Sequence, residues 1–231
     1  CKLSYVSNDG ESLVRKVKSI NAYLTSGSSV IVTPNNKPLS NLPEMSRGNS
    51  PTDGGHLLLE SHELDTLLLT KRDKAKFIKN FVGSRELIAG SHRYCIWIDD
   101  HLVDSAVKIP VIKSRIEAVR QFRLKSKKRA TVKAAEWSYR FDERKPISKS
   151  PIICVPVISS ENRPYLPVAL LAKGTVISNK AFSISGSGLW PLSIICSKLN
   201  ISWVSAVCAK MRSDYSYTNT LGWNTFPVPK L

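Results

Sequence analysis

Apolar residues recur at steps of three and four positions across residues 108–133, KIPVIKSRIEAVRQFRLKSKKRATVK. This spacing predicts one helix whose apolar face packs inward, and a proline near its start suits the first helical turn. In the last part, KSKKRATVK, basic residues take nearly every position. We therefore expect packing to hold the first half of the helix and charge to dominate the second. The expected inner face is Val111, Ile112, Ile116, Val119 and Phe122.

A second helical pattern begins at Pro191 and continues to about Met211, with Leu192, Ile195, Leu199 and Trp203 on one stripe. An aromatic residue at helical spacing is usually a core residue, so Trp203 is expected inside. Shorter helices are predicted over residues 61–68, capped by a serine, and 73–81, where apolar side chains again share a side.

Other segments show the short apolar runs of strands, bounded by turn residues. Residues 152–158 and 165–172 surround a polar turn and predict a hairpin. Residues 34–56 contain four prolines and three glycines without a periodic apolar face, so we expect a loop there. The further expected strands are residues 1–6, 29–33, 94–98, 174–178 and 181–184.

These patterns together predict a mixed α/β (α+β) fold, with a largely antiparallel sheet, flanking helices and long loops. The chain has 231 residues, of which 42% are hydrophobic and 23% charged, which is ordinary for a folded domain. No internal repeat of fixed period is visible.

Positive charge is concentrated in the basic helix. The chain carries a net charge of +16, and residues 108–133 hold ten cations against Glu117 alone, which is ten minus one, or +9. Like charges repel, so such a cluster favours a polyanion as its partner. The alternative is a solvated helix face that binds nothing.

The sequence favours nucleic acid over a membrane as that polyanion. No run of about eighteen apolar residues could form a spanning helix, and the first residues lack the apolar core of a signal peptide. Five scattered cysteines indicate free thiols in a reducing compartment, so we expect a cytoplasmic protein. Because the chain lacks an initial methionine and opens on an expected strand, we also expect a piece of a longer polypeptide.

Residues for catalysis or metal binding are not clustered. The four histidines are scattered, and no CxxC or HxxxH occurs. The sequence Asp99-Asp100-His101 fits a strand end, because neighbours on a strand point to opposite faces. Gly186-Ser-Gly188 lacks the third glycine and the lysine of a nucleotide loop, and no GxSxG is present. We therefore predict no catalytic residue and no metal site.

The polar turn at residues 159–163, SSENR, suits base recognition. Asn pairs with adenine, Arg with guanine, and Glu accepts from the cytosine amino group, whereas basic residues hold phosphates without reading sequence. A plain hairpin turn is the alternative interpretation of the same five residues.

Seven segments of the chain resemble the target recognition domain of MmeI-type (type IIL) DNA methyltransferases and restriction-modification proteins. The resemblance runs in order through most of residues 20–229. The segments are NAYLTSGSSVIV, KPLSNLPEMSRGNSPTDGGHLLL, FIKNFVGSRELIAGSHRYCIWI, EAVRQFRLKSKKRAT, VPVISSENRPYLPVALL, WVSAVCAKMRSDYSYTN and WNTFPVP.

The resemblance implies a DNA specificity module. In the family this domain follows a catalytic domain that uses S-adenosylmethionine to methylate the exocyclic amino group of adenine, with an NPPY or NPPF motif. No Asn-Pro-Pro occurs here. The implied partners are double-stranded DNA and the methyltransferase domain of the same polypeptide, and this fragment is expected to hold no cofactor. Residues 21–231 would form the recognition domain, and residues 1–20 the end of a preceding segment or a linker strand.

The resemblance also assigns roles to individual residues. The SSENR turn and the variable turn at residues 183–190 are implied to read bases, whereas the charge of the basic helix is what predicts that it holds phosphates. A general RNA-binding module, or a nuclease without a recognisable motif, remains the alternative. The implied base-reading residues are Ser159, Ser160, Glu161, Asn162, Arg163, Ser185 and Ser187. The phosphate-binding residues expected from charge are Arg123, Lys125, Lys127, Lys128 and Arg129.

Overall fold

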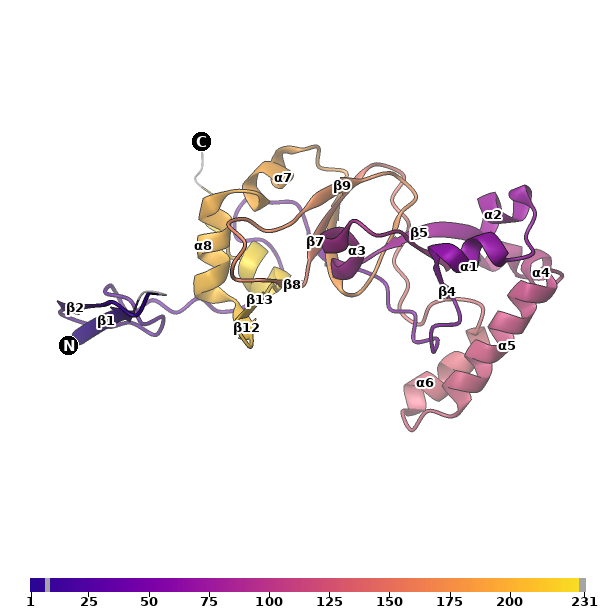
Figure 1. The fold of residues 1–231 in the computed structure, drawn as a ribbon, viewed down its shortest axis with the longest axis horizontal. Coiled ribbons are helices and arrows are strands. Elements are labelled where there is room, and N and C mark those ends of the chain that lie inside the picture. Colours follow the sequence, from indigo (N-terminus) through magenta and orange to yellow (C-terminus); the bar gives the residue numbers. More distant parts are fainter. Residues whose placement is uncertain (7–8, 229–231) are drawn as a thin grey trace.

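The computed structural model describes residues 1–6 and 9–228. The molecule is elongated, with the hairpin of β1 (Lys2–Val6) and β2 (Ser12–Lys16) at one end and helices α5 (Pro110–Leu124) and α6 (Arg129–Lys133) at the other (Figure 1). The expected turn between β1 and β2 lies partly outside the described residues. None of the described helices is both long and apolar enough to cross a membrane.

The half of the molecule next to α5 is built on a four-stranded sheet of order β10-β5-β6-β4. Its strands are β4 (Leu58–Glu60), β5 (Ile78–Val82), β6 (Arg93–Ile96) and β10 (Val176–Ile177). Only the β10–β5 pair is parallel. The connecting helices are α1 (Ser61–Thr66), α2 (Lys71–Phe77), α3 (Ser84–Ala89), α4 (Val103–Ala106) and the 3-10 turn η1 (Asp100–Leu102).

The inner face of α5 joins the core of this half. Ile112 and Val119 are fully buried and pack in one cluster with Phe77, Phe81 and Trp97. The apolar spacing in the sequence therefore identified the correct face for these two residues. Phe122 is instead 44% exposed, because its ring covers the backbone at Gly54 rather than entering the core.

The other half contains a second four-stranded sheet of order β3-β11-β7-β9. Every residue of the central strand β7 is buried, and its partners are all antiparallel. Ile152 of β7 lies opposite Leu171 of β9, which confirms the predicted antiparallel pairing of the two apolar runs. Their connection is longer than the predicted short turn, because residues 158 and 159 pair with a different sheet. The strands are β3 (Ser46–Arg47), β7 (Ile152–Pro156), β9 (Ala169–Leu171) and β11 (Ala181–Ser185).

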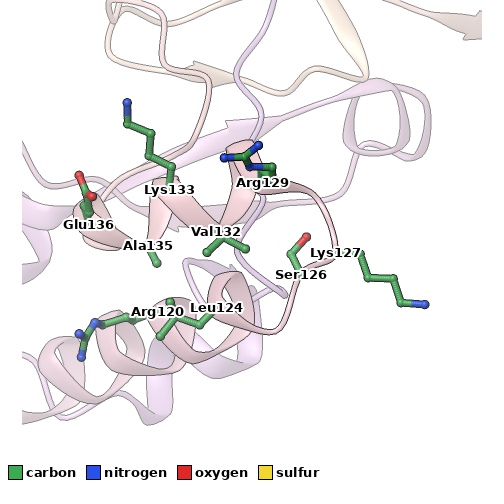
Figure 2. Close-up of a pocket in the computed structure, with 9 residues that line it drawn as sticks. All are labelled: Arg120, Leu124, Ser126, Lys127, Arg129, Val132, Lys133, Ala135 and Glu136. Atoms are coloured by element: carbon green, nitrogen blue, oxygen red, sulfur yellow. The ribbon is translucent and has the colours of Figure 1, made fainter.

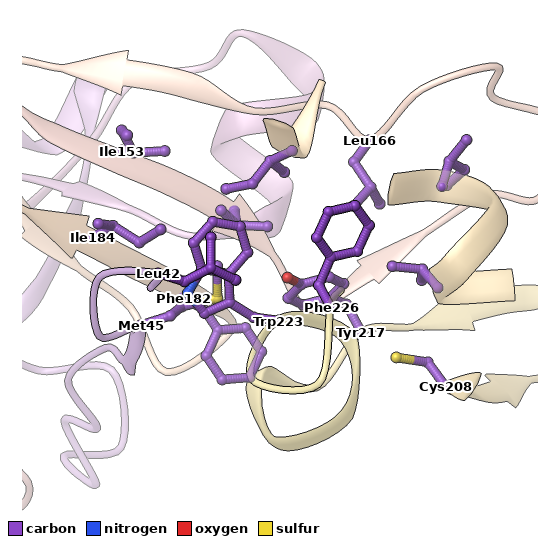
Figure 3. Close-up of a cluster of buried hydrophobic side chains, with 14 residues drawn as sticks. Leu42, Met45, Ile153, Leu166, Phe182, Ile184, Cys208, Tyr217, Trp223 and Phe226 are labelled. Atoms are coloured by element: carbon purple, nitrogen blue, oxygen red, sulfur yellow. The ribbon is translucent and has the colours of Figure 1, made fainter. Parts of the chain in front are cut away.

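A smaller antiparallel sheet of order β12-β13-β8 lies beside it, formed by β8 (Ile158–Ser159), β12 (Ala209–Met211) and β13 (Asp214–Ser216). The second core lies between these sheets, helices α7 (Trp190–Ile195) and α8 (Lys198–Val207), and the π-helix η3 (Asn219–Trp223) (Figure 3). Trp223 is completely buried there, and its Nε1 donates a hydrogen bond of 2.7 Å to the Pro43 carbonyl. The aromatic tail thus pins the proline-rich loop to the core.

The predicted mixed α/β class with mostly antiparallel pairing is confirmed. The pairing is distributed over four small sheets in the part of the chain that the structure describes. Residues 29–33, expected as a strand, form none, and Val30 and Ile31 are exposed. Residues 73–81 are not one helix either: α2 ends at Phe77 and the chain continues as β5, which pairs with both β6 and β10.

The predicted single helix over residues 108–133 is wrong. Helix α5 ends at Leu124, residues 125–128 reverse the chain, and α6 and the 3-10 turn η2 (Ala134–Trp137) pack back towards α5 (Figure 1). The Ser126 hydroxyl accepts a hydrogen bond of 3.1 Å from the Lys128 amide and closes the turn. Folding back buries Thr131, Ala134 and Ala135, which a straight helix would leave in water.

The predicted helix over residues 191–211 is also divided. Helix α7 ends at Ile195, and Ser197 caps α8 by accepting a hydrogen bond of 3.1 Å from the Asn200 amide. Residues from Ala209 onward then form β12. Trp203 packs against the second core as expected, with its ring edge-on to Phe226.

Gly48 follows β3 and lies against the backbone at the end of β10, where a side chain is not expected to fit. A Cβ atom there would lie 2.6 Å from the Ser178 carbonyl carbon and closer still to two backbone oxygens. We expect Gly48→Ala to lower the free energy of unfolding by about 3 kcal/mol. Gly55→Ala is the control, because its φ of +88° is strained but no atom lies within 4 Å, so about 1 kcal/mol is expected. Equal losses in urea denaturation would contradict the crowding argument.

Candidate nucleic-acid interface

The turn between α5 and α6 presents a group of exposed cations. We call residues 120–136 the basic hairpin. Its two arms enclose a groove of about 670 Å³ that has an apolar floor and a basic rim. Arg120, Lys127, Arg129 and Lys133 line the rim, with Glu136 as the acidic residue among the lining side chains.

The side chains of the basic hairpin point in two directions, between its helices or away from them (Figure 2). Leu124 and Val132 face each other between the helices, whereas Lys127 and Arg129 point outward. Within residues 1–6 and 9–228, the ion pairs include none formed by Lys127 or Arg129, and the pair of Arg120 with Glu117 is 3.8 Å long. The positive charge is therefore exposed and largely uncompensated, as a site for a polyanion requires.

Arg123 is not part of this surface, and the prediction that it holds a phosphate is wrong. The residue is 0% exposed, and its five N–H groups are all used inside the protein. Burial lowers the pKa of its guanidinium, while nearby Asp142 and Asp53 act in the opposite direction. Its acceptors, at 2.8 to 3.1 Å, are the carbonyl oxygens of Pro51, Thr52, Ala134, Trp137 and Arg140.

Arg123 therefore organises the basic hairpin from inside. Its hydrogen bonds join the end of α5 to the loop before β4 and to both ends of η2. The lysines around it, Lys125, Lys127 and Lys128, remain exposed together with Arg129. One arginine of the cluster thus holds the fold, and its neighbours in sequence face the solvent.

The SSENR turn begins at the end of β8. Ser159 is 1% exposed and pairs with Tyr215 of β13, so the prediction that its side chain reads a base is wrong. The next four residues form the accessible part, which we call the reading tip (residues 160–163). Ser160 closes it: its carbonyl accepts from the Arg163 amide at 3.2 Å, and its hydroxyl from the Asn162 amide at 3.3 Å. Glu161 and Asn162 are exposed as a result.

The reading tip is anchored to the adjoining sheet. The Lys210 ammonium lies 3.0 Å from Glu161 Oε2 and 5.4 Å from the centre of the Tyr215 ring. The hydrogen bond to Glu161 raises the pKa of Lys210, which keeps the ammonium charged. One oxygen of Glu161 is therefore engaged, and the other is free to accept from a ligand.

Ser185 and Ser187 lie away from the reading tip. In the β7–β11 ladder, Ser185 is opposite Ile152, whereas the reading tip follows the Pro156 end. Four residues at roughly 3.3 Å each separate these two ends by about 13 Å. Ser185 instead lines a cavity of about 380 Å³ together with Lys145 and Lys149. The hydroxyl of Ser187 is buried without a hydrogen-bond partner in the described structure.

A second basic cavity, of about 570 Å³, lies at the base of the reading tip. Its cations come from three separate parts of the chain and include Arg47, Arg85 and Lys180. Ile158 of β8 and Phe182 of β11 contribute to its apolar wall. Sequence reasoning missed these cations, because each stands in a segment without a basic run.

The acidic pair at the end of β6 has a structural explanation. Arg144 Nη2 lies 2.6 Å from Asp99 Oδ1, and Asp100 pairs with both Arg144 and Arg140. The Arg144 guanidinium also stacks 4.2 Å from the ring centre of Trp97. Across the described ranges, no three His, Cys, Asp or Glu side chains gather in a way that could hold a metal ion.

An exposed basic hairpin and, elsewhere on the same chain, an accessible polar turn define a domain suited to a polyanionic ligand. Residues 26–230 match the family described as the MmeI target recognition domain. The chain therefore belongs to the MmeI target recognition domain family, which confirms the resemblance found in the sequence.

Two relatives place the chain within larger proteins. It is 35% identical over 215 residues to DNA methyltransferase A of Bacillus subtilis (strain 168), covering 93% of this chain and 24% of that protein. It is also similar to a solved structure of the type IIL restriction-modification enzyme MmeI in complex with DNA, with a TM-score of 0.90 and 30% identity. That match covers 99% of this chain and 31% of the other. The chain thus spans about a quarter to a third of these relatives.

Proposed function

We propose that this chain is the sequence-specific double-stranded DNA recognition module of an S-adenosylmethionine-dependent adenine DNA methyltransferase of the restriction-modification type. The observation that carries the proposal is the uncompensated charge of the basic hairpin on the same chain as an exposed polar tip. Membership of the MmeI family supports it, as does the solved MmeI complex with DNA. Methyl transfer itself would belong to a catalytic domain elsewhere in the polypeptide.

The two surfaces would divide the work of recognition. Lys125, Lys127, Lys128 and Arg129 would hold phosphates, and the structure adds Arg120 and Lys133 at the rim of the same groove. The reading tip would contact base edges through Glu161, Asn162 and Arg163. Ser185 would be a separate contact at the far end of the β7–β11 pair.

The recognition module would act by positioning DNA for the adjoining domain. Methylation of an adenine requires that the base leave the duplex, so the bound sequence must be held in a fixed register with the catalytic pocket. We propose residues 21–231 as the recognition domain and residues 1–20, which include the β1–β2 hairpin, as the end of a preceding segment or a linker strand. The proposal is compatible with a whole protein that also cleaves DNA.

The thiols support a reducing compartment. All five cysteines are free, and Cys95, Cys154 and Cys208 are buried. Burial raises the pKa of Cys154 to about 12, so its thiol stays protonated. We propose a cytoplasmic location for the protein.

Competition binding tests the proposed function. The chain is incubated with a labelled random duplex, and unlabelled duplex DNA or RNA of equal length is added. We expect duplex DNA to compete better than RNA, with affinity falling steeply as salt rises. Stronger competition by RNA would favour a general RNA-binding module. Cleavage of plasmid by the chain with magnesium would favour a nuclease instead.

A further inference from the structure

We propose that the cavity at the base of the reading tip is a second phosphate site, which holds the backbone of the DNA strand next to the bases that the tip reads. We call its cations Arg47, Arg85 and Lys180 the tip clamp. The inference rests on the proposed function and goes beyond the basic hairpin, which lies at the other end of the fold (Figure 1).

The charge of the cavity is one-sided. Arg47, Arg85, Arg93 and Lys180 line it against Glu86, which is four minus one, or +3. Arg93 and Glu86 lie 3.6 Å apart and compensate each other. The tip clamp is the less compensated part. Arg85 is 72% exposed, and its contact with Glu60 is long, at 3.9 Å, and shared with Arg93. Within the described residues, neither Arg47 nor Lys180 forms an ion pair.

Backbone hydrogen bonds fix this charge beside the reading tip. The Lys180 carbonyl accepts from the Val157 amide at 3.1 Å and from the Ser84 hydroxyl. The Val157 amide also donates to the Ser84 hydroxyl at 3.0 Å. Lys180, the start of α3 with Arg85, and the strand that leads into the tip therefore meet at one junction.

The spacing suits a nucleic-acid groove. Glu161 follows Val157 by four residues, so it lies within about 14 Å of the junction even if the chain is fully extended. The major groove of DNA is about 12 Å wide. A side chain that contacts a base edge in the groove therefore has backbone phosphates within about that distance on either side. A phosphate of the groove wall would thus lie next to the cations at the base of the tip.

The remaining walls are suited to a phosphate and its sugar. Arg47 donates from Nε to the Asn179 carbonyl at 2.8 Å, which holds its side chain by one nitrogen and leaves the ends of the guanidinium for a ligand. Hydroxyl-bearing residues complete the polar lining, and Phe182 and Met211 supply an apolar surface. The polar residues are Ser84, Ser178, Ser216 and Thr218.

The test compares two double variants of the chain with equal loss of charge. Arg85→Ala with Lys180→Ala removes two members of the tip clamp. Lys71→Ala with Arg72→Ala is the control, because these residues are exposed on α2, away from the cavity. We expect the slope of log Kobs against log[salt] for duplex DNA to become less steep by about 1.8 in the first variant, at 0.9 per phosphate contact, and to stay unchanged in the second.

A phosphate scan locates the contact. Single phosphates of the bound duplex are replaced by neutral methylphosphonates. In the unaltered chain, methylphosphonates next to the bases that the reading tip contacts should weaken binding. In the variant that lacks Arg85 and Lys180, the same replacements should leave the affinity unchanged. An equal slope change in both double variants, or a scan that the tip-clamp variant leaves unaltered, would overturn the inference.

Three further outcomes distinguish failure of the inference from failure of the proposed function. If inorganic phosphate or a mononucleotide at millimolar concentration protects Arg85 and Lys180 from modification better than duplex DNA does, the cavity is a site for a free anion and the inference fails. If the unaltered chain binds no duplex DNA, the proposed function fails. If it binds but Arg85 and Lys180 do not matter, only the inference fails.

Discussion

Replacing Arg123 with methionine is expected to lower the free energy of unfolding by about 4 kcal/mol, the largest stability effect that we expect in the chain. The guanidinium is fully buried and supplies all five of its N–H groups to backbone carbonyls. Methionine fills a similar volume but leaves those carbonyls without donors in a buried site. Arg123→Lys should lower the free energy of unfolding by nearly as much, because the three donors of lysine lie on one nitrogen and cannot reach all five carbonyl oxygens.

Arg120→Met is the matched control for this prediction, since it lies on the same helix with its side chain 55% exposed. We expect a change below about 0.5 kcal/mol, as is usual for a surface ion pair. Urea denaturation with an unchanged m value would measure both variants. A loss below about 1 kcal/mol for Arg123→Met would show that the internal hydrogen bonds do not stabilise the basic hairpin.

The second large effect concerns DNA binding. Changing Lys125, Lys127, Lys128 and Arg129 together to alanine should make the salt dependence of duplex binding less steep by about 3.6, at 0.9 per phosphate contact. The free energy of unfolding should change little, because all four side chains are exposed. Fluorescence anisotropy at several salt concentrations would give the slope.

A control variant with the same loss of charge distinguishes local phosphate contacts from the effect of the protein's net charge on DNA binding. Lys2, Lys16, Lys71 and Arg72 are exposed and lie outside the basic hairpin. Their replacement by alanine should leave the slope nearly unchanged. If both fourfold variants reduced it equally, the basic hairpin would not be the phosphate clamp.

The contrast between Arg123 and its neighbours shows what a sequence pattern can predict. The apolar spacing in 110–119 identified the buried face of α5, because Ile112 and Val119 lie on the same helix at regular intervals. Arg123 stands in the same basic run as Lys125. Its burial depends on carbonyls from Pro51 and from the segment after α6, which the local pattern does not contain.

The reading tip shows the same limit. Two apolar runs around SSENR predicted a hairpin with a short polar turn. The two runs do pair antiparallel, but β8 lies between them and pairs with β13. The first residue of that turn is nevertheless buried, because Ser159 is in register with Tyr215 on a strand far along the chain. Arg47, Arg85 and Lys180 likewise converge only through tertiary packing, so their common cavity has no local signal in the sequence.

In the proposed function, the two exposed surfaces have separate roles: the basic hairpin would supply affinity, and the reading tip would supply sequence choice. Arg163→Ala should therefore reduce discrimination without changing the number of phosphate contacts. An arginine paired with guanine is worth about 1 to 3 kcal/mol of discrimination, which is roughly 5- to 150-fold in the ratio of dissociation constants.

The most direct test of this division is the ratio of dissociation constants for a duplex selected by the chain from a random pool and for its scrambled counterpart. We predict that the chain selects a defined sequence, that Arg163→Ala lowers the ratio by about 5- to 150-fold, and that the salt slope stays the same. Enrichment of no sequence would contradict this division of roles, as would an Arg163→Ala variant that left the ratio unchanged and reduced the salt slope instead.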